Sequence, residues 1–349
     1  MAITLHDKFA RQIDKAFHID SLIKGRLSNS YSFSGVKTIK VVSPQTVPMG
    51  DYTRAGTNRY GTPTEMQDVV QELTLTQDKS FAMTIDKGNN LDQSGLKTAG
   101  GMLHLQIMER AVPVMDKYCF EQLAHKAGTI AANPEKLTKD TVLDRIQRAT
   151  QTMDDAEVPQ DNRTLFVSNE VFSLIKKTGI DLKTEHTGEK AFVKGQVGEI
   201  DGMKIVKVPA SRWVDGLNFL VVYKNSAIAP VKLNDTKMHQ DPPGISGNLL
   251  EGRQYYDCFV LSAKCMGVYA EVDTSGSAVV LDVPQVTADG AVTPADGATA
   301  VYTTDGSDPR YSMSAKTGIS IEAESGDTIK VYQYKAGAFP SAVVSVVYN

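Results

Sequence analysis

The side chains most often used for catalysis and metal binding are scattered along this sequence. The six histidines stand at positions 6, 18, 104, 125, 186 and 239, and no two are two, three or four residues apart. A local zinc site uses ligands at such short spacings, so the sequence predicts none. The three cysteines, Cys119, Cys258 and Cys265, are too few for a disulfide framework. We predict no catalytic, cofactor-binding or metal-binding residues.

Sequence motifs for phosphate binding and for nucleophilic catalysis are also absent. No GxxxxGK[ST] or GxGxxG pattern occurs, and "GISG" at 244–247 follows two prolines instead of a strand. His104 is interpreted as a helix-face histidine, and Asp154 and Asp155 as a solvated helix end. Cys258 and Cys265 are predicted on opposite sides of one strand. These patterns favour a protein that is not an enzyme.

Length and composition indicate a globular protein. A chain of 349 residues with 41% hydrophobic and 22% charged side chains suits about two domains. No apolar run approaches the roughly 20 residues of a membrane span. The N-terminal "MAITLHDKFARQIDKAF" is charged and lacks the apolar stretch of a secretory signal. We therefore expect assembly in a reducing cytosol.

The net charge of −4 is concentrated near the C-terminus. Residues 278–349 contain eight acidic and four basic side chains, so the first 277 residues contain 33 of each sign. Because Lys and Arg form no cluster, the chain is not predicted to recognise nucleic acid by gripping its phosphates. The balanced part and the acidic part are interpreted as different modules.

The first 86 residues contain segments that lack obvious cover. Phe9, Ile13 and Phe17 form one apolar stripe, which packs either on its own core or on a neighbouring subunit. Strand-like runs at 69–76 and 79–86 are separated by Gln77 and Asp78, and we predict that they form a long hairpin. An isolated two-stranded ribbon is only marginally stable, so the pattern indicates assembly with other subunits.

A long helix and a mixed α/β region are expected next. Residues 95–127 hold helical spacing, with a bend at Pro113 and an end at Gly128. Residues 138–270 alternate between helices and strands, with Ser168 as a helix cap and a polar loop at 181–190. One of these helices has an apolar stripe formed by Val142, Ile146, Ala149 and Met153. Gly198 and Gly202 bracket a predicted turn, and "DPPG" at 241–244 forms another.

The order of these elements resembles the major capsid proteins of tailed bacteriophages, which have the HK97-type fold. The phrases "GEIDGMKIVKVP" (198–209), "NFLVVYKNSAIAPVKL" (218–233) and "EGRQYYDCFVLSAKCMGVYA" (251–270) are similar to strands of that family. The resemblance covers about residues 1–272 and implies an α+β (mixed α/β) capsid fold. It further implies hexamers and pentamers of an icosahedral shell around double-stranded DNA. The implied location is the virion capsid, assembled in the host cytoplasm.

The resemblance also implies a division of the chain. The expected segments are an N-terminal arm (1–34), an extended hairpin loop with flanking strands (35–94), a spine helix and peripheral domain (95–137, with part of 225–272), an axial domain with closing strands (138–272), a linker (273–278) and a surface domain (279–349).

The C-terminal segment resembles a different family. "VYTTDGSDP" (301–309), "TGISI" (317–321) and "DTIKVYQYKAGAFPSAVVSVVY" (327–348) are similar to the immunoglobulin-like C-terminal domain of chitobiase and β-hexosaminidase. On a capsid protein it would be an outward-facing β-sandwich. Two roles stay open: an acidic coat, or weak glycan binding through four rings, Tyr302, Tyr311, Tyr332 and Tyr334.

The expected partners follow from the capsid resemblance. They are further copies of the chain, portal and scaffolding proteins, and packaged double-stranded DNA held without sequence specificity, with surface glycans as an open partner of 279–349 and no membrane. No long charged helical segment precedes the arm, so we expect a separate scaffolding protein. The alternatives are an encapsulin-type nanocompartment shell and a carbohydrate-active enzyme, the latter indicated by the tail alone.

Overall fold

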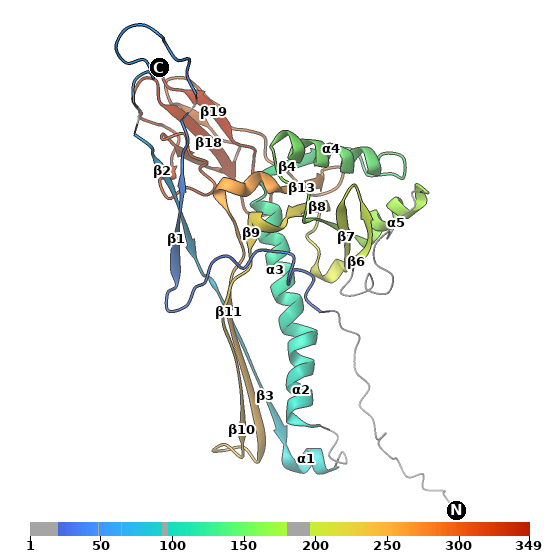
Figure 1. The fold of residues 1–349 in the computed structure, drawn as a ribbon. Helices are drawn as coiled ribbons and strands as arrows, with labels where there is room; N and C mark the ends of the chain where they lie inside the picture. The colour runs from blue at the N-terminus through green and yellow to red at the C-terminus, as the bar shows by residue number, and fades with distance from the viewer. Residues whose placement is uncertain (1–19, 48, 64, 93–96, 180–195) are drawn as a thin grey trace, which may run out of the picture.

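The computed structural model describes residues 20–47, 49–63, 65–92, 97–179 and 196–349. Its centre is a six-stranded mixed sheet in the order β4-β13-β8-β5-β7-β6 (Figure 1). The strands span Thr129–Asn133, Val268–Asp273, Leu217–Tyr223, Arg163–Ser168, Met203–Val208 and Gln196–Ile200, in that order. The β4–β13 and β5–β7 pairs are parallel, and the other pairs are antiparallel.

Helices cover both faces of this sheet because successive strand residues point to opposite sides. Leu165 and Val167 of β5 pack in a cluster with α4 (Val142–Asp155) and α5 (Asn169–Lys177). Phe166 packs on the other face against Phe120 of α3 (Val112–His125). The predicted α4 stripe is confirmed, since its four members are all buried: Val142, Ile146, Ala149 and Met153.

Two local predictions about turns and caps are confirmed. The Oγ of Ser168 accepts a hydrogen bond from Val171 N at 3.2 Å, which caps α5. Asp201 and Gly202 have φ of 48° and 71° and join β6 to β7 in a two-residue hairpin turn, which confirms the prediction at Gly202. The turn is shorter than predicted, because Gly198 lies within β6. The predicted loop that follows α5 lies outside the described residues.

The long helix forms with a change of helical type ahead of its proline. α2 (Ala99–Gln106) continues through a π-helical turn (Ile107–Ala111) into α3 (Val112–His125). A proline lacks an N–H and crowds the carbonyl four residues earlier, and the wider turn lies directly before Pro113. Gly128 does not end the helix as predicted, because α3 ends at His125 and Gly128 does not have a positive φ. A Cβ at Gly128 would lie 2.3 Å from Cys265 O, so glycine is needed there for close backbone packing.

The two predicted hairpin strands exist, but the prediction that they pair with each other is wrong. β2 (Asp68–Thr74) pairs with β1 (Thr38–Pro44), so the hairpin is β1–β2 with its loop at 45–67. β3 (Gln77–Asp86) instead joins β11 (Gly247–Tyr256) and β10 (Val231–Gln240) in a three-stranded ribbon. The 241–244 turn connects β10 to β11, as predicted.

A buried carboxylate binds the segment between β2 and β3, where the chain leaves the β1–β2 sheet and enters the three-stranded ribbon. Asp257 is 2% exposed, and its Oδ2 accepts hydrogen bonds from N and Oγ1 of Thr76, both at 2.8 Å. Its Oδ1 accepts from Tyr118 of α3, also at 2.8 Å. These contacts fix the backbone between β2 and β3 where a turn was predicted. The short strands β9 (Ala227–Ile228) and β12 (Phe259–Val260) pair close by.

Part of the predicted N-terminal arm is packed on its own subunit. Leu22, Ile23, Leu27 and Phe33 are all at most 4% exposed. The first three join the large cluster around α3, and Phe33 stacks on Phe259. The expectation that residues 1–34 lack cover within one subunit is therefore wrong for this stretch. The predicted stripe of Phe9, Ile13 and Phe17 lies outside the described residues.

The chain after residue 278, here called the C-terminal module, contains only strands. A four-stranded sheet has the order β17-β16-β18-β19, and β14 pairs with β15. These strands span Lys316–Thr317, Thr299–Thr303, Thr328–Tyr334, Val344–Val347, Gln285–Val286 and Val292–Thr293, in that order. They enclose a small core of their own, formed by Val292, Ala300, Ile321, Ile329 and Val331. Within the described part of the chain, no helix is both long and apolar enough to span a membrane.

Candidate interaction surfaces

Of the histidines and cysteines in the described residues, Cys119 and Cys258 come together in the core, where a hydrogen bond between the two thiols and burial raise the pKa of Cys119. His104 lies exposed on α2, whereas the ring of His125 stacks on Phe339 with a centroid separation of 4.6 Å. Cys258 is buried between β11 and β12, and Cys265 lies in a 3₁₀ turn (Ser262–Gly267), so the prediction of one shared strand is wrong. Among the described residues, no three His, Cys, Asp or Glu side chains are arranged to hold a metal ion.

The structure contains a buried arginine that sequence reasoning missed. Arg163 is 1% exposed, and its Nη2 donates to Asp154 Oδ1 at 2.6 Å while its Nε donates to Pro159 O at 2.9 Å. The prediction that Asp154 is a solvated helix end is therefore wrong, because its carboxylate pairs with a buried arginine. The Asp154 carboxylate neutralises the Arg163 guanidinium, which is buried at the start of β5.

A second buried ion pair anchors the N-terminal segment on the spine helix. Arg212 Nη1 lies 2.8 Å from Asp116 Oδ2, and both side chains are at most 5% exposed. Asp116 also accepts from Ser21 Oγ at 2.7 Å and from Leu22 N at 2.9 Å. Burial raises the pKa of Asp116, and these hydrogen bonds oppose that rise. The chain leaving the arm is thus tied to α3 by charge as well as by apolar packing.

The β1–β2 loop exposes large apolar side chains far from the central sheet. In Figure 1 this blue loop extends past the C-terminal module. Met49 is 101% exposed and Tyr60 is 92% exposed, and Tyr52 packs edge-on against Tyr60 at 5.0 Å. Val47 and Met66 are also more than half exposed. Large apolar groups gathered on one protruding loop are typical of a surface that binds a protein partner.

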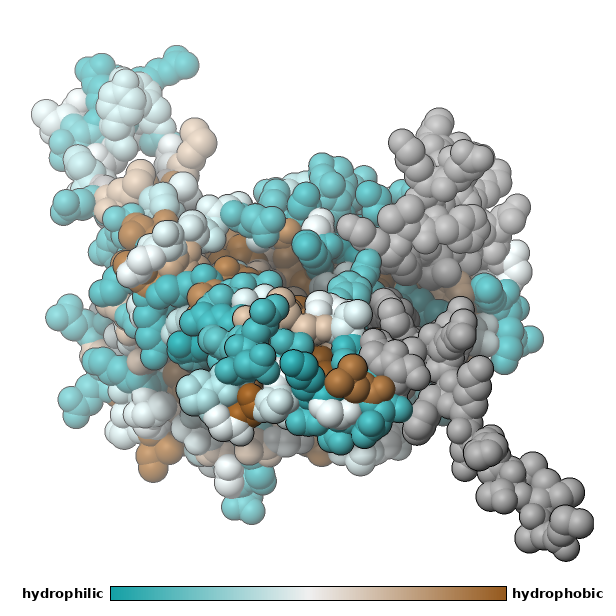
Figure 2. Space-filling model, turned by 90° about the horizontal axis from the view of Figure 1, so that it is seen from below, coloured by the Kyte–Doolittle hydropathy of each residue, from teal (hydrophilic) through white to brown (hydrophobic). Residues whose placement is uncertain are grey.

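The far half of the spine helix is a second apolar surface. α1 (Lys87–Asp92), α2 and the π-helical turn contain no buried residue, although α2 is rich in Met and Leu. Leu91 is 68% exposed and Met238 on the neighbouring ribbon is 51% exposed. Seen from below, hydrophobic patches lie between hydrophilic side chains (Figure 2). The apolar residues of α2, Met102, Leu103 and Leu105, are half-buried, so the exposed apolar groups at this end of the molecule are those of Leu91 and Met238.

The same helix holds a carboxylate in an unusual environment. Glu109 lies in the π-helical turn, and its Oε1 is buried without a hydrogen-bond partner within the described part of the chain. A buried acceptor without a partner costs free energy.

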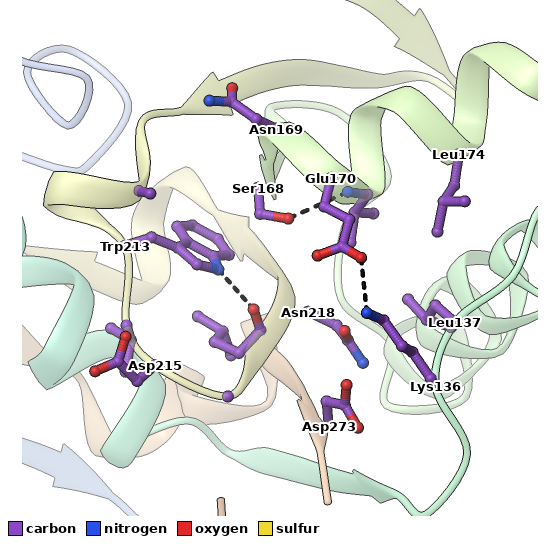
Figure 3. A pocket seen from close by; sticks show the side chains of 15 residues that line it. Lys136, Leu137, Ser168, Asn169, Glu170, Leu174, Trp213, Asp215, Asn218 and Asp273 are labelled. Carbon is purple, nitrogen blue, oxygen red and sulfur yellow. Dashed lines mark hydrogen bonds and ion pairs between the residues drawn. The ribbon is translucent and has the colours of Figure 1, made fainter. Parts of the chain in front are cut away.

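One cavity opens at the edge of the central sheet, with a volume of about 410 Å³. Figure 3 shows Lys136 pointing to Glu170, and their charged atoms are 3.0 Å apart. The indole Nε1 of Trp213 donates to Leu217 O at 2.6 Å and closes one wall. Asp273 and Asn218 lie below the ion pair. The charges of Lys136 and Glu170 are paired with each other inside the cavity. The Oγ of Ser168, which also lines it, is engaged in the cap of α5.

The four tyrosines considered for sugar stacking are not equally accessible. Tyr311 is 6% exposed and packs in the main cluster, so it cannot stack on an external sugar. Tyr302 and Tyr332 are half-buried, and Tyr302 packs against the core of the module. Tyr334 is 46% exposed and tilts against Tyr332 with a centroid separation of 6.3 Å. The structure therefore does not assemble the predicted set of rings on one open face.

Comparison with known proteins places the fold among phage capsid structures. No protein-family model matches the sequence, and none of the curated proteins matches it. A solved structure from Mycobacterium phage Che8 is similar, with a TM-score of 0.64 and 15% identity over 78% of this chain and 98% of that chain. The capsid structure of cyanophage P-SCSP1u gives 0.60 and 13%, over 78% and 93%. The mature capsid of bacteriophage PhiM1 gives 0.58 and 14%, over 79% and 93%.

At these identities the likeness concerns the fold alone. The share of this chain left unmatched is close to the share that follows residue 278. This chain therefore has a mixed α+β fold similar to those of phage capsid structures.

Proposed function

We propose that this chain is the major capsid protein of a tailed bacteriophage with an HK97-type fold. In this proposal the chain forms the hexamers and pentamers of an icosahedral shell around double-stranded DNA. The observation that carries the proposal is the set of exposed apolar side chains on the β1–β2 loop, together with the exposed Leu91 and Met238 beside α2, in a fold similar to phage capsid structures. Neighbouring copies would cover both surfaces.

The proposed division of labour follows the elements. Residues 1–34 serve as the arm, the β1–β2 hairpin as the extended loop, α2–α3 as the spine, and the six-stranded sheet as the axial domain. The proposed partners are a portal protein, a separate scaffolding protein and packaged DNA. Because residues 1–277 carry equal numbers of acidic and basic side chains, DNA would be confined mainly by the closed wall. Assembly would occur in the host cytoplasm.

The C-terminal module is proposed to be an immunoglobulin-like domain on the outer surface. Its net charge supports the coat role, since an acidic layer makes particles repel one another. The glycan role has less support, because Tyr311 is buried and only Tyr334 among the four rings is exposed.

Expression in a bacterial cytoplasm with and without a candidate scaffolding protein tests the function. We expect closed shells or capsomer rings in electron micrographs of the sedimented fraction. Nuclease-resistant DNA inside particles from infected cells would support the capsid role. A copurified enzyme cargo in place of DNA would instead support the nanocompartment alternative.

A further inference from the structure

The C-terminal module inserts two aromatic side chains into the core of the preceding part of the chain, residues 20–277, here called the body. Tyr311 and Phe339 are 6% and 4% exposed, and both belong to the cluster built around α3 and the central sheet. The ring of Phe339 lies nearly parallel to that of His125, in the last turn of α3. The module therefore shares a core with the body, in addition to its own.

The two residues that follow the 301–309 motif donate hydrogen bonds to the backbone just after the end of α3. Arg310 Nη1 donates to Ala127 O at 2.8 Å and to Gly128 O at 3.0 Å. Tyr311 Oη donates to Lys126 O at 2.6 Å. Carbonyl groups at a helix C-terminus lack partners within the helix and favour a nearby cation. Residues about 180 positions away in the sequence thus supply the donors.

The arginine is positioned for this contact by its own loop. Asp308 accepts from Arg310 Nη2 at 2.7 Å and from Nε at 3.1 Å, which holds the guanidinium plane in a two-bond arrangement. The Arg310 side chain is 9% exposed. Because the guanidinium is buried and held by two hydrogen bonds, it is rigid. Its contacts therefore fix the end of α3 relative to the module.

The same loop also binds the hairpin. Met313 N donates to Val70 O of β2 at 3.0 Å. Its side chain is 51% exposed, so the contact is made by the backbone. Residues 310–313 therefore touch the end of the spine helix and one strand of the hairpin at once.

The connection to the module is packed as well. Ala278 and Val280 lie against the main cluster, and a Cβ at Gly216 would fall 2.2 Å from the Ala278 Cβ. The segment predicted as a linker at 273–278 is thus held on the body at its end.

We propose that the C-terminal module is a brace that fixes the β1–β2 hairpin relative to the spine helix through Arg310, Tyr311 and Met313. The orientation of the hairpin relative to α3 then depends on the module even in an unassembled subunit. This inference goes beyond the proposed function, because it concerns one chain and does not require a shell.

Hydrogen exchange followed by mass spectrometry on unassembled full-length subunits tests the brace. We expect Arg310→Met to raise exchange at least tenfold in 120–128 and in 68–74, while 328–334 in the core of the module stays unchanged. Lys316→Met is the matched control, since Lys316 is an exposed cation of the same module. Met313→Pro removes only the donor to Val70, so it should loosen 68–74 and leave 120–128 protected.

Each outcome decides the proposal. Unchanged exchange of 68–74 in both variants would overturn it, even if the helix end loosens in Arg310→Met. If Arg310→Met also loosens 328–334, the decision rests on Met313→Pro. In that variant a rise confined to the hairpin supports the brace, and an unchanged hairpin refutes it.

Discussion

Replacing Gly128 by alanine tests the contact between the end of the spine helix and the 3₁₀ turn at Ser262–Gly267. A Cβ on Gly128 would lie 2.3 Å from Cys265 O, 2.5 Å from Cys265 C and 2.7 Å from Met266 N. All three are backbone atoms, so no side-chain rotation can relieve the overlap. The backbone must separate by about 1 Å, and overpacking of this kind costs roughly 1–3 kcal/mol or more. We expect the free energy of unfolding to fall by about 3 kcal/mol.

Equilibrium unfolding in urea measures this change, with the fluorescence of the one tryptophan as the signal. Trp213 is 8% exposed and lies in the same core cluster as Cys265. Gly100→Ala is the control, because Gly100 is in α2 with no atom within 4 Å of a built Cβ. Alanine is the better helix former there by about 1 kcal/mol, so the control should be as stable as the wild type or more so. If Gly128→Ala unfolded at the same urea concentration as the wild type, the close backbone approach would be refuted.

Three further changes test other parts of the structure. Gly202→Ala places a side chain at φ 71° and should lose about 1 kcal/mol in urea unfolding, whereas Gly276→Ala, without a positive φ or a close neighbour, should be neutral. Asp116→Asn removes the charge opposite buried Arg212 and should cost roughly 3 kcal/mol, with faster hydrogen exchange in 20–28. Burial raises the pKa of Glu271, so this group lowers stability as pH rises above its ordinary pKa of 4.5. Glu271→Gln should make the dependence of the unfolding midpoint on pH less steep above that value.

Distinct results would contradict each of these expectations. A Gly202→Ala protein as stable as Gly276→Ala would exclude strain at the β6–β7 turn. Undiminished protection of 20–28 in Asp116→Asn would show that apolar packing alone holds the N-terminal segment. For Glu271, the sign follows from its folded-state pKa lying above its unfolded-state value: the carboxyl binds its proton more tightly when folded. Identical pH profiles for the wild type and Glu271→Gln would therefore refute the assignment.

Local patterns predicted the central sheet and its helices well. The α4 stripe, the Ser168 cap and the Gly202 turn each depend on residues within one element or one turn. Such features are set by periodicity and backbone sterics, which a single sequence displays directly. The order of helices and strands between 138 and 270 could be inferred for the same reason.

Pairing between distant segments could not be predicted in this way. Nothing near β2 and β3 in the sequence indicates that Asp257 holds Thr76 and separates them into different sheets. Asp154 looked solvated because its partner Arg163 follows a bend. The donors to the backbone just after α3 are Arg310 and Tyr311, which follow a motif that indicated only a turn. The predicted linker at 273–278 therefore gave no indication of the contacts between the C-terminal module and the body.

Imaging of the assembled product tests the central claim most directly. The chain, expressed with a candidate scaffolding protein and isolated by sedimentation, should form closed shells in electron cryomicroscopy. In those shells the exposed apolar side chains of 45–67, and those of Leu91 and Met238 beside α2, should contact neighbouring copies. A chain that remains monomeric at high concentration, forms no particle with the scaffolding protein, and keeps both surfaces in water would contradict the account.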